Sequence, residues 1–207
     1  MNKVIPFLLL IAAIPSARLI ADTDLSDLPD HLSVMNPHSD SPESYHLLKT
    51  GVAERRFLFI PIYKMAHYMA SLNTQVPVLD APGPKAVRIV FSRKINGDRI
   101  QREFLETIQN AVTPESWQEI RQSARAYADP FAKGDTRPGD TFTVAWLDHG
   151  TVVSHFNGSP LSTIQNPQFA RALWSVWVGP ESVVDRDRLL LKVRYSPSPG
   201  VELPHKQ

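Results

Sequence analysis

The spacing of apolar residues changes near Asp98, and this change constrains the fold more than any other feature of the chain. Before it, residues 57–69 are rich in aromatic and β-branched side chains and residues 86–91 alternate, as strands do. After it, apolar residues recur at every fourth position from Ile100 to Val112, which is the spacing of one apolar helical face. The chain therefore combines strands with helices.

Further segments extend this pattern toward the C-terminus. Pro114 suits the first turn of a second helix, with Thr113 as its N-cap. The remaining predicted elements are a short strand over 31–35, a β-hairpin over 141–158, a helix over 169–178 that Gly179 ends, and either a helix or a short strand over 186–193. The sum predicts an α+β fold, in which an antiparallel sheet has its helices segregated on one face.

The first 21 residues have the composition of an export signal. Lys3 supplies positive charge, residues 4–14 form an apolar run of 11 residues, and Ala21 is a small residue that can precede cleavage. The run is too short to cross a bilayer core about 30 Å thick as a helix. An N-terminal core helix and an uncleaved anchor are the alternatives.

Cleavage would remove Lys3 and Arg18 but no acidic residue, so the net charge would fall from +1 to −1. The chain has no cysteine, which excludes disulfides, thiolate metal sites and a lipid-modified cysteine after the apolar run. We therefore expect a periplasmic or secreted protein with no stable membrane anchor after signal cleavage.

Composition divides the rest of the chain. After the signal peptide (residues 1–21), we predict an irregular polar lead-in over 22–43, one domain over 44–195 and a proline-rich tail over 196–207. Hydrophobic residues make up 43% and charged residues 21% of the chain, which excludes global disorder. The near-zero net charge lacks the excess of basic residues that binds nucleic acid, so nucleic acid is not expected as a partner.

Common catalytic and metal-binding motifs are missing from the sequence. There is no nucleophile elbow, phosphate-binding loop, dinucleotide fingerprint or zinc-protease motif, and none of the seven histidines has a partner at metal-ligand spacing. Asp148, His149 and Ser154 lie close along the chain, but hairpin residues mostly point apart, so we interpret them as turn residues. We predict no catalytic residue, no metal and no cofactor.

Two arginines precede the apolar segment 57–69. Because neighbours on a strand face opposite sides, either Arg55 or Arg56 should face the apolar layer and find an anion. Tyr63 shares parity with Arg55, but the two would lie roughly 26 Å apart along a straight strand. They can share a site only if the chain turns between them, with Pro61 as a candidate bend. The alternative is an ion pair for Arg55 and a core position for Tyr63.

The sequence resembles the bacterial chalcone isomerase-like proteins from about Leu47 to Leu191. The segment from Gly51 to Met69 is similar to the family's G-x-G-x-R, aromatic strand and V-Y-x-x-x-x-Y pattern. The matching residues and blocks are Gly51, Arg55, Tyr63, Tyr68, Lys133–Asp135, Phe156–Gly158 and Phe169–Pro180, with Ala53 in place of the second glycine. The resemblance implies the chalcone isomerase-like fold, an α+β fold with a large antiparallel sheet covered on one face by a layer of helices and a cleft between them.

The resemblance does not imply isomerase activity. Plant chalcone isomerases use an arginine, a strand threonine, and a tyrosine, an asparagine and a hydroxyl residue from the helical layer. Here Arg55 fits the arginine and Tyr63 takes the place of the threonine. No tyrosine stands in residues 95–110, Asn110 comes too late, and Ala170 stands at the hydroxyl position. Three of the five roles are thus unfilled.

Non-catalytic relatives of this fold bind fatty acids through an arginine and a tyrosine, which Arg55 and Tyr63 resemble. We therefore expect a protein that is not an isomerase and that binds a small amphipathic carboxylate, such as a fatty acid, between sheet and helices. One alternative is an isomerase or lyase acting on a phenolic small molecule. Another is a ligand-free interaction module of the envelope, which a filled cleft or exposed tryptophans (Trp146, Trp174, Trp177) would favour. Ligand identity and oligomeric state stay open.

Overall fold

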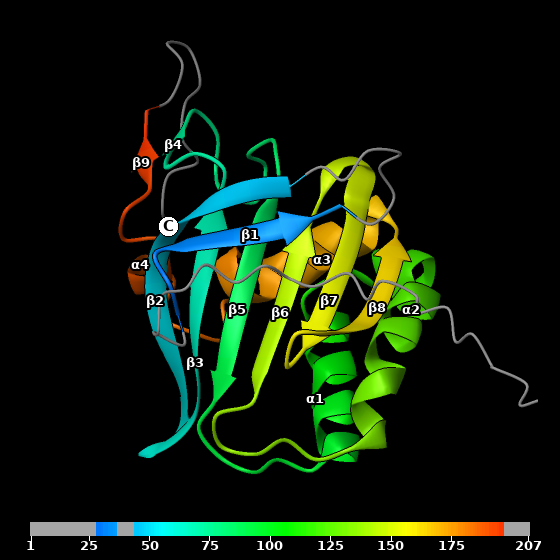
Figure 1. Cartoon of the computed structure of the whole chain (residues 1–207). Coiled ribbons are helices and arrows are strands. Elements are labelled where there is room, and N and C mark those ends of the chain that lie inside the picture. Colours follow the sequence, from blue (N-terminus) through cyan, green and yellow to red (C-terminus); the bar gives the residue numbers. More distant parts are fainter. Residues whose placement is uncertain (1–27, 37–43, 197–207) are drawn as a thin grey trace, which may run out of the picture.

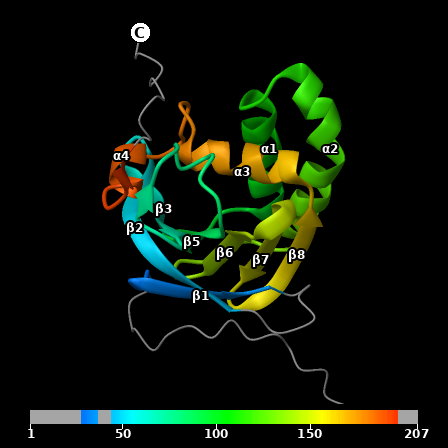
Figure 2. The same cartoon turned by 90° about the horizontal axis from the view of Figure 1, so that it is seen from above.

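The computed structural model describes residues 28–36 and 44–196, so the predicted signal peptide and nearly all of the predicted tail lie outside the described residues. A seven-stranded antiparallel sheet forms the body of the molecule, in the order β1-β2-β3-β5-β6-β7-β8 (Figure 1). Its strands are β1 (His31–Met35), β2 (Ser44–Phe57), β3 (Ile60–Met69), β5 (Lys85–Phe91), β6 (Thr141–Trp146), β7 (Thr151–Phe156) and β8 (Ser159–Gln165). The sheet is curled, and β1 crosses its outer side (Figure 2).

The helices gather on the opposite face of this sheet from β1, as Figure 2 shows. They are α1 (Gly97–Asn110), α2 (Pro114–Ala128), α3 (Pro167–Val178) and α4 (Arg186–Leu189), with short 3-10 turns η1 (Asp129–Lys133) and η2 (Asp148–Gly150). A small parallel pair joins β4 (Asn73–Thr74) to β9 (Arg194–Tyr195). The predicted α+β class, with a large antiparallel sheet and helices on one face, is confirmed.

Local signals in the sequence set the helix boundaries. The Thr113 side chain accepts a hydrogen bond from the amide of Ser116, which caps α2 as predicted, and Pro114 occupies its first turn. Helix α3 ends at Gly179. Over residues 186–193, where the sequence fitted helix or strand, the structure has the short helix α4.

Two apolar cores lie on the two sides of the sheet. The larger one fills the space between sheet and helices, where Met65, Val87 and Val144 meet Leu173 and Trp174 of α3. The smaller one lies under β1 and includes Leu32, Val34, Leu47, Tyr68, Ala86, Ala145, Leu147 and Val153. The predicted strand over 31–35 is thus present as β1, and it covers the outer face of the sheet.

The structure differs from the sequence prediction in two strands. Residues 57–69 do not form one strand, because the chain turns at Leu58 and Phe59 between β2 and β3. Strand β8 was not predicted, because its sequence SPLSTIQ is mostly polar and partly exposed, and it pairs only with β7 at the edge of the sheet. None of the described helices is long and apolar enough to cross a membrane.

The tryptophans that would serve an interaction module are mostly inside. Trp174 is fully buried, Trp177 is 6% exposed, and Trp146 is half-buried. Trp174 lies edge-on to both of the others, with ring centroids 5.7 and 5.9 Å away. These three residues are therefore part of the core and do not form an exposed aromatic surface.

Candidate functional site

The hairpin of β2 and β3 brings Arg55 and Tyr63 side by side. Arg55 is the direct cross-strand partner of Tyr63. Opposite residues on an antiparallel pair have Cβ atoms about 4.5–5.5 Å apart and point to the same face. The turn that achieves this lies at Leu58 and Phe59, and not at Pro61, which pairs with Arg56 inside the hairpin.

Arg55 has an unusual set of partners for an arginine on the helical side of a sheet. Its guanidinium donates to the carbonyl of Val183 (2.7 Å), in the connection between α3 and α4, and its side chain is exposed. Within residues 28–36 and 44–196, no carboxylate forms an ion pair with it, whereas Arg56 pairs with Glu54 at 2.5 Å. Because a guanidinium has five N–H donors, most of the donors of Arg55 stay available to an anion.

Tyr63 is held as a neutral hydrogen-bond donor. Tyr63 is half-buried, and burial raises the pKa of Tyr63 to about 12. The Arg55 guanidinium and the Trp177 side chain offset part of that rise in pKa. The ring also lies edge-on to Phe91, with centroids 6.4 Å apart. At neutral pH the hydroxyl therefore keeps its proton beside an exposed cation.

Apolar side chains pack behind this pair. Met65 and Met69 of β3 belong to the larger apolar core, as does Trp177 of α3. These core side chains take up space that an alkyl chain entering from Arg55 would need, and a filled space of this kind is what the ligand-free alternative predicts. Methionine side chains are flexible and polarizable, so this part of the core is suited to repacking around a guest.

Most other residues that carry the family resemblance have structural tasks. A Cβ on Gly51 would lie 2.2 Å from the carbonyl oxygen of Arg188, so glycine lets β2 pack against α4. The Tyr68 hydroxyl donates to the carbonyl of Pro29 on the outer face of the sheet. Asp135 accepts a hydrogen bond from the amide of Gly97 at the start of α1. Asn157 and the following glycine make the turn between β7 and β8 with positive φ angles of 48° and 78°.

A buried polar cluster, which sequence reasoning missed, connects β2, β3 and α3. Trp174 donates its indole N–H to Nε2 of His67 (3.2 Å), so this nitrogen is an acceptor. Nδ1 of His67 then carries the proton and donates to Oγ1 of Thr50 (2.9 Å), which donates onward to the carbonyl of Leu189 (2.8 Å). Burial, aided by Lys85, lowers the pKa of His67 to about 3. The cluster is therefore neutral and fully hydrogen-bonded, as a structural element is.

Lys85 is a second buried polar residue that the sequence did not single out. Its ammonium donates to the carbonyl of Ala81 and lies 4.3 Å from the ring centroid of Trp146. Burial lowers its pKa to about 8; Asp80 opposes this shift and Arg171 adds to it. The carbonyl of Ala81 and the ring of Trp146 thus stabilise the charged form of Lys85, which keeps its charge near neutral pH.

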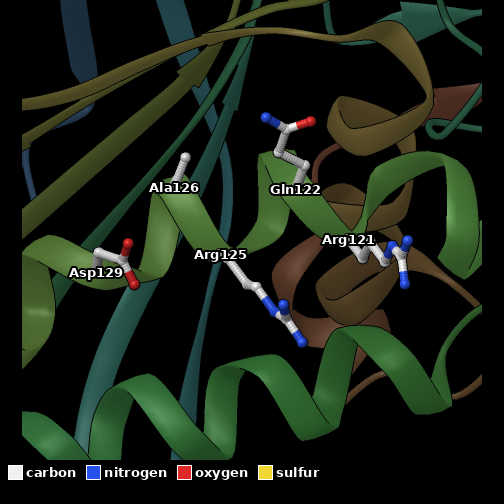
Figure 3. A pocket seen from close by; sticks show the side chains of 5 residues that line it. All are labelled: Arg121, Gln122, Arg125, Ala126 and Asp129. Atoms are coloured by element: carbon white, nitrogen blue, oxygen red, sulfur yellow. The ribbon is translucent and has the colours of Figure 1, made fainter.

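The remaining candidate sites lack the required geometry. Asp148 accepts the Tyr45 hydroxyl (2.6 Å) and Ser154 bonds to Ser162 (2.8 Å), so the Asp–His–Ser run around η2 has other partners. In the described part of the chain, no three or more acidic or histidine side chains group as metal ligands. A solvent-open hollow of about 490 Å³ is lined by Arg121, Gln122, Arg125, Ala126 and Asp129 of α2 and η1 (Figure 3). It shares no lining residue with the Arg55–Tyr63 pair.

Comparison with known proteins agrees with this architecture. Among solved structures, the chain is similar to a fatty-acid binding protein of Arabidopsis thaliana, with a TM-score of 0.61 and 13% sequence identity, over 76% of this chain and 95% of that chain. At this identity the likeness shows a common fold. No curated protein matches the chain in sequence. The chalcone isomerase-like family matches residues 28–190, which is most of the chain, and the protein therefore belongs to the chalcone isomerase-like family.

Proposed function

We propose that the protein binds a small amphipathic carboxylate, such as a fatty acid, and catalyses no reaction on it. The observation that carries the proposal is the exposed Arg55 guanidinium, which has no carboxylate partner in the described residues and lies directly opposite Tyr63. A carboxylate placed there would accept charge-assisted hydrogen bonds from Arg55 and a hydrogen bond from the Tyr63 hydroxyl. The fatty-acid binding protein with the same fold supports this class of ligand.

The protonation state of Tyr63 favours binding over catalysis. A general acid or base works best when its pKa lies near the working pH, and the pKa of Tyr63 is raised to about 12. Asn110 is exposed at the last position of α1, and Ala170 is buried in α3 without a polar side-chain atom. Neither residue thus replaces the asparagine or the hydroxyl residue that the plant isomerases take from the helical layer, and the tyrosine of that layer is missing from residues 95–110 as well.

The binding test compares two neighbouring arginines. Hydrogen bonds to charged groups contribute roughly 1.5–3 kcal/mol, and each 1.4 kcal/mol is about tenfold in affinity. Arg55→Ala should therefore weaken the binding of a fluorescent fatty acid about 10- to 100-fold. Arg56→Ala is the matched control, because Arg56 pairs with Glu54 on the other face and should leave affinity unchanged. Tyr63→Phe should weaken binding by a smaller factor, since it removes one neutral donor.

Three results would contradict the proposal. Native mass spectrometry of protein purified without detergent could recover no lipid, together with no binding of the fluorescent fatty acid. Arg55→Ala could keep full affinity, which would remove the head-group assignment. A fatty alcohol of equal length could bind as well as the acid, which would mean that no carboxylate is recognised. The first result would favour the ligand-free interaction module.

We further propose that residues 1–21 are removed on export and that the mature protein lies in the periplasm or is secreted. The proposal is supported by Lys3, the apolar run over residues 4–14 and the small residue Ala21. The mass of the protein recovered from its native host should correspond to a chain that begins at Asp22. Recovery of a full-length chain from the membrane fraction would contradict the proposal.

A further inference from the structure

The tip of the β2–β3 hairpin concentrates exposed apolar residues. In the described part of the chain, six large apolar side chains are exposed, and four of them are consecutive. Phe57 is 63% exposed, Leu58 78%, Phe59 90% and Ile60 48%. We call these four residues the apolar tip. Figure 1 shows the hairpin extending past the neighbouring strands, with the tip at the lower left.

The backbone of the apolar tip is strained at Leu58, a residue whose large side chain lies in solvent. Leu58 has a φ of +55°, in a two-residue turn where glycine, asparagine or aspartate is usual. For a bulky residue this conformation is a genuine outlier. Strained residues of this kind cluster at functional segments such as active sites and ligand clamps. Leucine and phenylalanine are thus present at two positions where neither folding nor solubility favours them.

Basic residues stand directly behind the apolar tip. From residue 54 to residue 64 the chain has three cations, Arg55, Arg56 and Lys64, and one carboxylate, Glu54. All three cations are exposed. An apolar end followed by a collar of positive charge is complementary to a bilayer with anionic headgroups, where aromatic side chains enter the interface and basic residues meet the phosphates.

The dimensions of the hairpin also fit an interface. Phe57 pairs with Ile60, so the backbone is hydrogen-bonded up to the last pair before the turn. The apolar tip consists of the pair Phe57–Ile60 and the two turn residues beyond it, so it is roughly 7 Å long at about 3.3 Å per residue. This length lies within the depth of about 5–10 Å at which interfacial segments enter a bilayer. A stable protein interface uses about 20–30 residues a side, far more than the apolar tip and its collar supply. A protruding two-stranded tip with a basic collar fits a lipid surface better than it fits a second protein.

We propose that the apolar tip inserts into the interface of a bilayer containing anionic lipids and docks the protein on the membrane surface. Arg55 stands two residues before Phe57 on the same hairpin, so docking would place the Arg55–Tyr63 pair next to the lipid headgroups. Only the idea that this position lets a fatty acid pass between the membrane and the Arg55–Tyr63 pair rests on the proposed function. Docking itself depends on the tip and its collar.

The absence of cysteine in the chain allows a site-specific test. A cysteine introduced by Phe59→Cys can be labelled with an environment-sensitive dye, and Leu191→Cys gives a matched control at an exposed apolar residue far from the tip, 76% exposed. Vesicles of phosphatidylcholine with roughly a third phosphatidylglycerol supply the anionic surface. The dye at position 59 should brighten and shift to the blue on these vesicles, less on pure phosphatidylcholine, and the dye at position 191 should not respond.

A second variant tests the tip without a label. Phe57→Ser combined with Phe59→Ser should lower co-sedimentation with anionic vesicles at least tenfold and should leave fatty-acid binding in vesicle-free buffer unchanged. An unresponsive dye at position 59, an equal response at both positions, or undiminished sedimentation of the double variant would overturn the proposal. A dye signal that follows protein concentration without vesicles would overturn it in favour of a second copy. Loss of docking with intact fatty-acid binding would leave the proposed function standing.

Discussion

The buried cluster around His67 predicts a specific loss of stability in mild acid. The unfolded chain binds a proton at His67 below pH 6.5, whereas the folded chain, with a pKa of about 3, does not. Between these values the unfolded state holds more protons, so the free energy of unfolding falls as pH falls. The stabilisation is complete above pH 6.5 and is lost progressively toward pH 3.

The size of the effect follows from the two pKa values. Linkage gives about 1.4 kcal/mol for each pH unit between them, and the curve is shallower near pH 6.5 where the unfolded histidine is half protonated. From pH 7 to pH 5, His67 should therefore cost about 2 kcal/mol of stability. This is a large share of the roughly 5–15 kcal/mol that holds a typical domain folded.

The assay is denaturant unfolding followed by circular dichroism at pH 7 and pH 5, for the protein and for His67→Gln. Glutamine does not titrate but can still accept from Trp174 and donate to Thr50, so the variant keeps part of the cluster. Other titrating groups, including His155 with its pKa lowered by burial, are common to both proteins and cancel in the difference. If the two proteins lost equal stability between the two pH values, His67 would not be held neutral by its surroundings.

Two further substitutions test the packing and capping of the fold. Gly51→Ala should destabilise the protein by about 1–3 kcal/mol, because the new Cβ would collide with α4 carbonyl oxygens at 2.2 and 2.6 Å. Denaturant unfolding checks this against Gly134→Ala, whose Cβ meets open space. Equal losses of stability in the two variants would refute the prediction. Asn166→Ala should cost about 1 kcal/mol, because its side chain accepts from the amide of Phe169 at the start of α3. An unchanged midpoint in that variant would mean that the cap does not stabilise the helix.

Helices were easier to predict from the sequence than strands, because their ends are fixed by neighbouring residues. Thr113 and Pro114 set the start of α2, and Gly179 sets the end of α3, all within one turn of the helix concerned. Strand β8 has no such local marker: its serines and threonines become a strand only because β7 offers an unpaired edge. Whether such a segment forms a strand depends on the neighbouring strand with which it pairs, and its own residues do not reveal this.

The sequence indicates which residue types form the candidate site, but it does not reveal which other parts of the chain they contact. An arginine beside an apolar strand needs an anion, which points to Arg55 or Arg56, and the family resemblance then selects Arg55 together with Tyr63. Its contact with Val183 depends on how the α3–α4 connection folds back over β2, which no local pattern encodes. The cluster of Thr50, His67 and Trp174 was missed for the same reason, since its members come from three elements.

The turn at Leu58 and Phe59 is where sequence reasoning failed most clearly, and the failure is informative. The segment Phe57–Pro61 has no glycine, asparagine or aspartate before Pro61, so its composition predicts a continuing strand. The chain turns nevertheless, with Leu58 in a left-handed conformation and four apolar side chains in solvent. Natural chains break local rules mainly at functional or strained sites. The same turn sets Arg55 opposite Tyr63, so one departure from the rules creates both the candidate binding pair and the apolar tip beside it.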